Sequence, residues 1–137
     1  MAQDPAFAAT PVVGAAILGS AETSLTVPVN SSVILTAGAN GLLLSEVAVI
    51  GVTTSLAPAV VAGLVYLFWY DGTTYHHFDD ITISAALTGS STVAPFRTNK
   101  LYNDSPRAVP TGWFLRASHS IAGNANLLKV TGFGSNF

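Results

Sequence analysis

The chain has 137 residues, of which 50% are hydrophobic and 9% are charged. This length suits a single domain, and the charged fraction lies far below the roughly 25% that is typical of soluble domains. The net charge is −2 and the five basic residues form no run, which argues against a nucleic-acid-binding protein. A surface so poor in charge predicts that other subunits cover part of it.

The sequence also argues against a disulfide-stabilised or thiolate-metal protein and against a membrane-spanning protein. The sequence has no cysteine, so disulfides and thiolate metal sites are excluded. Residues 47–70 carry no formal charge and are long enough to span a bilayer. However, Pro58 and Gly63 interrupt this stretch, and no flanking Lys or Arg sets an orientation. We therefore expect two strands joined by a loop here, and no membrane partner.

Residues 1–11 predict an extended N-terminal arm, because prolines at both positions 5 and 11 oppose a long helix. Residues 12–137 predict one domain. An arm of this kind can lie on a neighbouring subunit, so Pro5, Phe7 and Pro11 are candidate contact residues.

The first half of the domain predicts four strands. They lie at residues 12–20, 25–29, 32–37 and 42–53, with Asn40-Gly41 as a hairpin turn between the last two. Strict alternation would place Leu42, Leu44 and Glu46 on one face of the fourth strand, together with Ala48 and Ile50. Glu46 is then expected at a sheet rim or opposite a basic partner, since an unpaired buried carboxylate is costly.

Residues 63–83 carry the clearest pattern in the chain. The run 65–70 is β-branched, aromatic or large and apolar, and Asp71-Gly72 follows it directly. This pair favours a type I′ turn with a positive φ at both central residues, so the segment predicts a β-hairpin. Of Leu67 and Phe68, only the neighbour that faces inward is expected to lie in the core.

Further strands are expected at residues 93–102, at 113–121, with residues 109–112 as the entry to this strand, and at 127–133. The total is about eight strands, and no segment is long and amphipathic enough for a helix. The sequence therefore predicts an all-β fold, an antiparallel β-sandwich of the jelly-roll type.

One cluster holds residues that can bind a metal: His76, His77, Asp79 and Asp80. In a regular strand His77 and Asp79 share one face, while His76 and Asp80 share the other. Two ligands on a face make no closed site, and a hydrated sheet edge is the other interpretation, so ion binding is left open. No nucleophile elbow, P-loop or dinucleotide-binding pattern is present, so we expect no catalytic residue, no cofactor and no enzymatic activity.

Aromatic side chains suggest a carbohydrate-stacking platform as one possibility. The candidates are Trp69, Tyr70, Tyr75, Tyr102 and Trp113. The other interpretation is that these residues form the core and rim of a sandwich, where each indole N–H must find a partner if it is buried.

Four blocks of sequence and a glycine-rich end carry a resemblance to a known family. The blocks are residues 4–11 (DPAFAATP), 36–41 (TAGANG), 67–73 (LFWYDGT) and 112–118 (GWFLRAS). Together they resemble a family of small virion proteins of tailed bacteriophages. The resemblance implies a capsid decoration (cement) protein, a β-sandwich on the outer capsid surface that stabilises the shell. It carries over no catalytic residue, and the sequence departs from the family pattern at residues 56–70 and 76–80.

The implied partners are the major capsid protein and further copies of the chain, as a dimer or a trimer. Edge strands and the arm are the expected subunit contacts. A phage tail or fibre component is a second hypothesis, and a glycan-binding module is a third.

Overall fold

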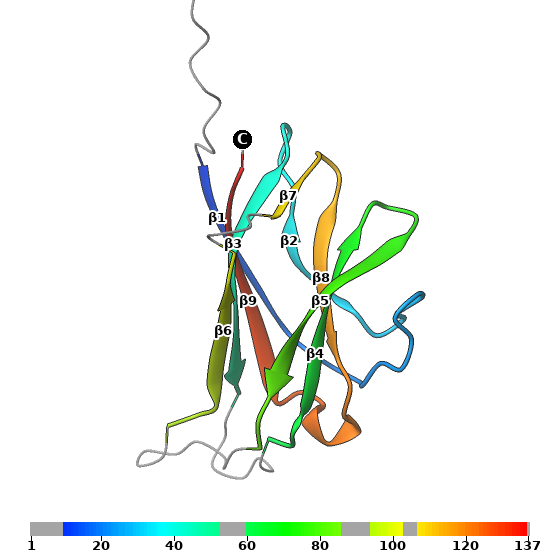
Figure 1. The fold of residues 1–137 in the computed structure, drawn as a ribbon, viewed down its shortest axis with the longest axis vertical. Coiled ribbons are helices and arrows are strands. Elements are labelled where there is room, and N and C mark those ends of the chain that lie inside the picture. The colour runs from blue at the N-terminus through cyan, green and yellow to red at the C-terminus, as the bar shows by residue number, and fades with distance from the viewer. Residues whose placement is uncertain (1–9, 53–59, 86–93, 103–106, 137) are drawn as a thin grey trace, which may run out of the picture.

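The computed structural model describes residues 10–52, 60–85, 94–102 and 107–136, whose strands form two antiparallel sheets (Figure 1). Sheet A contains, in spatial order, β1 (Thr10–Ile17), β9 (Leu128–Asn136), β3 (Leu42–Gly51) and β6 (Arg97–Leu101), and the short β7 (Arg107–Val109) also pairs with β3. Sheet B contains β2 (Ser32–Thr36), β8 (Phe114–His119), β4 (Gly63–Tyr70) and β5 (Tyr75–Ile83). A 3₁₀ turn, η1 (Ala122–Asn124), precedes β9. The predicted all-β sandwich is confirmed.

The connections cross repeatedly from one sheet to the other. Of the strands that follow one another in sequence, β4 and β5 alone pair directly among the described residues. With β7 as a short addition, this is the connectivity of a jelly roll. It corrects the hairpin expected at Asn40-Gly41. Gly41 adopts a φ of 108° and its N–H donates to the Gly38 carbonyl, but this turn carries the chain from β2 in sheet B to β3 in sheet A.

The core lies between the inner faces of the two sheets, where apolar side chains from both are excluded from solvent. Its fully buried members include Val47, Val49, Leu128 and Val130 from sheet A, and Val65, Leu67 and Leu115 from sheet B.

Three β-bulges change the alternation of the strands. A bulge places two residues of one strand opposite one residue of its partner, so the side chains that follow it swap faces. In β2 the bulge lies at Ile34, and both Ile34 and Leu35 are buried. The other two lie at Ser45 in β3 and at Phe78 in β5.

The bulge at Ser45 corrects the predicted faces of residues 42–53. Leu44 faces the core before the bulge and Val47 faces it afterwards. Glu46 therefore lies on the outer face of sheet A, with Ala48 and Ile50. It is neither at a rim nor opposite a basic side chain, and its carboxylate accepts a hydrogen bond from Asn99 Nδ2 at 2.9 Å.

The two sheets approach closely along the side formed by β1 and β2. A Cβ atom on Gly14 would collide with the Ile34 carbonyl oxygen, and one on Gly132 would lie 2.9 Å from Leu35 Cδ1. The absence of a side chain at these two positions therefore allows β1 and β9 to pass close to β2.

The opposite side is closed by a polar contact between β5 and β6. The Asp79 carboxylate accepts hydrogen bonds from Lys100 Nζ at 2.6 Å and from the Tyr102 hydroxyl at 2.8 Å. Burial raises the pKa of Asp79. The hydrogen bonds from these two donors and from the Asp80 N–H lower it by more, so the pKa lies below its ordinary value. The charged form of Asp79 thus joins the two sheets.

The N-terminal strand begins earlier than predicted. Pro11 lies in β1 opposite Ser135, so the last two residues of the predicted arm belong to sheet A. Pro5 and Phe7 lie outside the described residues. Where residues 47–70 are described they form β3 and β4, and no helix in the described part of the chain has the length and hydropathy needed to cross a membrane.

Strand β4 is buried on both faces. Leu67 faces the core, whereas Phe68 faces away from sheet A and is nevertheless 0% exposed. The rings of Tyr66, Tyr75 and His77 surround Phe68, with centroid distances of 6.4, 6.2 and 5.5 Å. The expectation that only one of the two neighbours is buried is therefore wrong, because an aromatic layer covers the outer face of sheet B.

We predict that Leu67→Ala and Phe68→Ala each lower the free energy of unfolding by about 2–5 kcal/mol, because each removes a fully buried side chain from a packed layer. Urea denaturation followed by circular dichroism measures both. Thr82→Ala, at an exposed position of β5, is the control and should change the free energy by about 0.5 kcal/mol or less. A small loss for Phe68→Ala alone would contradict the outer layer.

Candidate interaction surfaces

The predicted metal-binding cluster is divided among separate contacts. The bulge at Phe78 puts His77 and Asp80 on the same face, with 2.6 Å between His77 Nε2 and Asp80 Oδ1. Asp79 turns to the opposite face, toward β6. The predicted sharing of faces is therefore wrong, because a regular strand was assumed.

His76, the fourth member of that cluster, contacts the hairpin turn: its Nε2 lies 3.1 Å from Asp71 Oδ2. Within the described ranges, no three His, Asp or Glu side chains gather closely enough to hold a metal ion.

Two of the predicted stacking aromatics lie in the core. Trp69 is 6% exposed and stacks on Phe78, with a centroid distance of 4.9 Å. Tyr102 is 4% exposed, and its hydroxyl donates to Asp79. Neither ring is accessible to a sugar, so the single platform that the sequence suggested is not formed.

Two other predicted aromatics meet on the outer face of sheet B. Tyr70 and Tyr75 stack with a centroid distance of 4.3 Å, and the Arg116 guanidinium lies 5.7 and 5.8 Å from their ring centroids. Ser31 holds this guanidinium, since its hydroxyl and its carbonyl accept hydrogen bonds at 2.9 and 2.8 Å. The rings are half-buried and positioned before any ligand arrives.

Trp113 lies apart from this pair. It is half-buried against the core and stacks on His76, with a centroid distance of 5.4 Å. Of the eight candidate contact and stacking residues, Pro11 thus lies in sheet A, Trp69 and Tyr102 in the core, Tyr70 and Tyr75 on the outer face of sheet B and Trp113 at the hairpin end, while Pro5 and Phe7 lie outside the described residues.

The outer face of sheet A is a broad apolar surface that the sequence did not reveal. We call it face A, and it consists of Val13, Ala15 and Ile17 from β1, Lys129, Thr131 and Phe133 from β9, Glu46, Ala48 and Ile50 from β3, and Arg97, Asn99 and Leu101 from β6. Four of its large apolar side chains are exposed: Val13 by 65%, Leu101 by 57%, Ile17 by 49% and Phe133 by 36%. Nothing within the described residues covers them.

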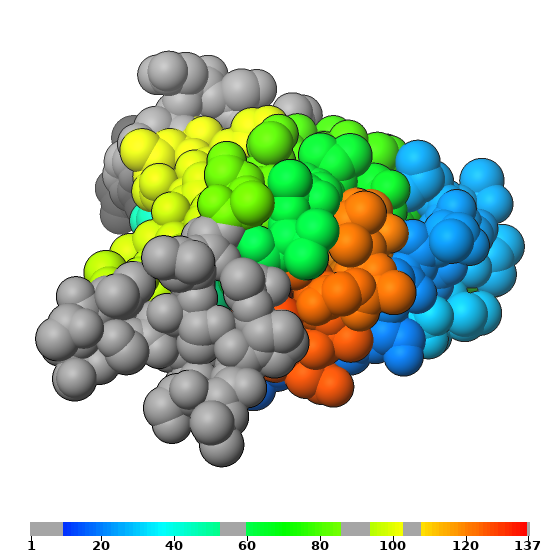
Figure 2. Space-filling model, turned by 90° about the horizontal axis from the view of Figure 1, so that it is seen from below, coloured from blue at the N-terminus to red at the C-terminus, as the bar shows by residue number. Residues whose placement is uncertain are grey.

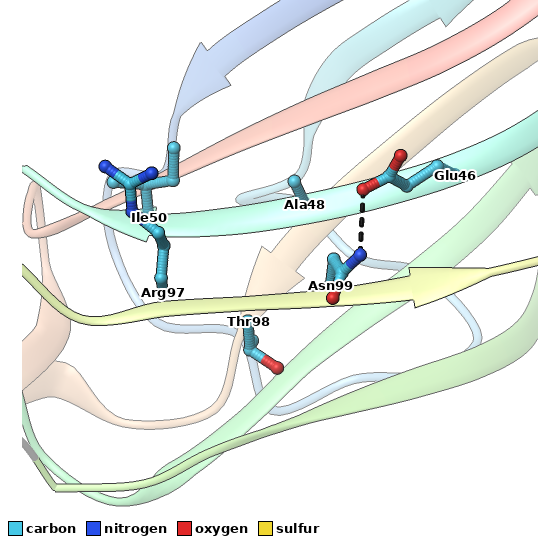
Figure 3. A pocket seen from close by; sticks show the side chains of 6 residues that line it. All are labelled: Glu46, Ala48, Ile50, Arg97, Thr98 and Asn99. Atoms are coloured by element: carbon cyan, nitrogen blue, oxygen red, sulfur yellow. Dashed lines mark hydrogen bonds between the residues drawn. The ribbon is translucent and has the colours of Figure 1, made fainter.

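A shallow hollow of about 290 Å³ lies on face A between β3 and β6 (Figure 3). Glu46, Ala48 and Ile50 project into it from β3, and Arg97 and Asn99 project from β6, while Thr98 points to the other side of the strand. The bond between Glu46 and Asn99 crosses its floor. The hollow is open to solvent, and its lining carries one carboxylate and one guanidinium.

A second apolar surface is formed by residues 18–31, which we call the apolar loop. It lies at the end of the molecule opposite β6 in Figure 2. Its exposed apolar side chains are Leu25 (40%), Val27 (63%) and Val29 (80%).

A buried carboxylate holds the apolar loop in place. Glu22 is 4% exposed and accepts hydrogen bonds from the N–H groups of Thr23, Ser24 and Asn30 at 2.8 to 3.0 Å. Burial raises the pKa of Glu22, but the hydrogen bonds from these donors lower it by more, so the pKa lies below its ordinary value. The predicted strand at 25–29 is wrong, because side-chain acceptors take backbone N–H groups that a sheet ladder would need.

Asp71 organises the hairpin end of sheet B. Its Oδ1 accepts the Thr74 and Thr73 N–H groups at 2.7 and 2.8 Å, and its Oδ2 contacts His76. These contacts lower the pKa of Asp71 to about 2. Only Gly72 of the Asp71-Gly72 pair has a positive φ, so the hairpin is confirmed but the type I′ turn is not.

We predict that Asp71 titrates with a midpoint of about 2 in the folded protein, as measured by NMR of its carboxyl carbon. Its ordinary pKa in an unfolded chain is about 3.9, so the unfolded state binds this proton more tightly. The stabilisation by Asp71 is therefore present above about pH 4 and is lost as the pH falls toward 2. Asp71→Asn should flatten the dependence of stability on pH in that window. A midpoint near 4 would contradict the turn.

The described surfaces thus comprise face A, the apolar loop and the Tyr70–Tyr75 pair. Comparisons with protein-family models, with curated proteins and with solved structures gave no significant match.

Proposed function

We propose that the chain is a structural virion protein, a capsid decoration subunit that binds the major capsid protein and its own copies on the outer capsid surface. The supporting observation is the position of face A and the apolar loop. Face A belongs to sheet A, on the left of Figure 1, and the apolar loop, which follows β1 in sequence, lies at the right-hand margin. A subunit that bridges two neighbours needs two such contacts.

The build of the sandwich suits this role. Glycine contacts close one side and Asp79 closes the other, so a load on one surface is transmitted to the other through a packed core. Jelly rolls occur in viral capsid and lectin domains, which is support by analogy at the level of the fold. In this proposal the protein acts by binding alone, without a cofactor, a nucleic acid or a membrane.

We assign the contact with the capsid shell to the apolar loop. Val27 and Val29 are among the most exposed apolar side chains described, and the exposed part of the loop carries no charge. Because Glu22 already orders the backbone, little conformational entropy is lost when the loop docks. The apolar tips can therefore act as anchors in pockets of the shell.

Cryo-electron microscopy of the particle that carries the chain tests the location. The expected result is density on the outer capsid lattice with the apolar loop toward the shell. Val27→Glu should weaken co-sedimentation of the purified chain with stripped capsids by about tenfold or more, since it places a charge in a desolvated contact. Thr82→Glu adds the same charge on β5 and should leave binding unchanged. Density on the tail, or no chain in the particle, would contradict the proposal.

The stacked pair Tyr70–Tyr75 favours glycan binding as a second candidate function, since Arg116 holds two partly exposed rings in place. A glycan array probed with the purified chain separates the two functions. The virion proposal expects no specific signal. A signal that Tyr75→Ala abolishes, while the thermal unfolding curve stays within a few degrees of the wild type, would support the glycan-binding module instead.

A further inference from the structure

We propose that face A joins two copies of this chain face to face, sheet A on sheet A, about a twofold axis that runs across the strands. This inference builds on the proposed function, in which copies of the subunit assemble. It is tested on the purified chain, so its failure and the failure of the virion proposal can be distinguished.

The strand register arranges face A in three rows that cross β1, β9, β3 and β6. One end row contains Ile17, Lys129, Ile50 and Arg97; the middle row contains Ala15, Thr131, Ala48 and Asn99; the other end row contains Val13, Phe133, Glu46 and Leu101. The large apolar groups thus lie in the end rows, and the middle row holds small or short side chains.

This distribution suits the approach of a second sheet. Packed sheets lie about 10 Å apart, with interdigitating side chains. A twofold axis along the middle row brings the small residues of the two copies together and places each end row over the opposite end row of the partner. Val13 then meets the partner's Ile17, and Leu101 meets the alkyl part of the partner's Arg97.

The charges of face A are complementary to themselves in this arrangement. Glu46 lies opposite the partner's Ile50, whose neighbours in its row are Lys129 and Arg97. Each carboxylate therefore falls between two cations of the other copy. An axis along the strands would place the row of Glu46 over itself, and that row contains no cation. Charge pairing thus selects the axis across the strands.

The available area suits a weak, reversible contact. The four strands have 8, 9, 10 and 5 residues. With a mean of about eight residues at roughly 3.3 Å each and strands about 4.8 Å apart, they give a face of about 500 Å² per copy. Two copies then bury about 1,000 Å², which is below the roughly 1,200–2,000 Å² of stable interfaces and is typical of weak, reversible ones. The dimer is therefore expected to dissociate on dilution.

Sedimentation velocity of the purified chain between about 1 and 100 µM tests the proposal. A dimer is expected at the higher concentrations. Val13→Glu should raise its dissociation constant by about tenfold or more, because the carboxylate would be desolvated against apolar groups. Val27→Glu is the matched control, since Val13 and Val27 are 65% and 63% exposed but only Val13 belongs to face A. Val27→Glu should leave the dissociation constant unchanged.

A charge exchange tests the axis. Glu46→Lys should weaken the dimer about tenfold, because it brings three cations together, and Lys129→Glu should weaken it as well. The double variant Glu46→Lys with Lys129→Glu should recover most of the affinity. Melting curves by circular dichroism confirm that each variant is folded. Weakening by both single changes without recovery in the double variant would overturn the proposed arrangement.

Three results would overturn face A as the contact. They are a wild-type monomer at all concentrations, a dimer that Val27→Glu dissociates, and a dimer that survives Val13→Glu but is lost when residues 1–9 are deleted. A monomer that still binds capsids would refute the dimer and leave the virion proposal standing. A dimer whose chain occurs in no particle would support the face A contact and refute the virion proposal.

Discussion

The three β-bulges decide which side chains of this sandwich face inward, and the rest of the structure depends on that choice. The bulge at Ser45 lets β3 supply both Leu44 and Val47 to the core and turns Glu46 outward. The bulge at Phe78 brings Phe78 onto Trp69 and points Asp79 at β6. Without these shifts, face A would lose its only carboxylate, and the side of the sandwich formed by β5 and β6 would lose the Asp79 contact that joins the two sheets.

Because both sides of the sandwich are closed, we place the proposed subunit contacts on its outer surfaces rather than at its strand edges. Strand β1 packs against β2 through Gly14, and β5 carries a bulge and charged residues, which are features that discourage strand pairing at an edge. The edge-strand contacts inferred from the sequence stay a prediction beside the contacts that we propose through face A and the apolar loop. The low charged fraction leaves exposed apolar side chains on two surfaces. One is the apolar loop, and the other is face A, which also carries Glu46, Lys129 and Arg97.

The sequence predicted those features of the fold that depend on residues close together in the chain. The β-branched and aromatic run before Asp71-Gly72 identified the β4–β5 hairpin, and the number and spacing of apolar runs identified the fold class. The turn at Asn40-Gly41 was assigned to a hairpin because the same residues serve a connection between sheets equally well. Which sheet receives β3 depends on its distant partners β9 and β6, and a single sequence does not show them.

The candidate contacts were less predictable for the same reason. Trp69 and Tyr70 are adjacent and chemically alike, yet one lies in the core and the other on the outer face. The spacing of Leu42, Leu44, Val47 and Val49 contained the signal of the bulge, since strict alternation breaks between the second and third of them. The segment 25–29 misled because its alternation is real, but Glu22 and Ser24 bind the backbone groups that a strand would have used.

The position of β9 has a consequence for biosynthesis. Thr10 pairs with Asn136, and β9 separates β1 from β3 in sheet A. The growing chain therefore exposes the apolar inner sides of β1 and β3 until residues 128–136 have left the ribosome. Such long-range pairing makes folding slow, and the interval before it is when a nascent chain aggregates most readily. Sheet A is thus completed only after its central strand β9 has emerged, and chaperones that shield the chain during that interval favour the yield of folded protein.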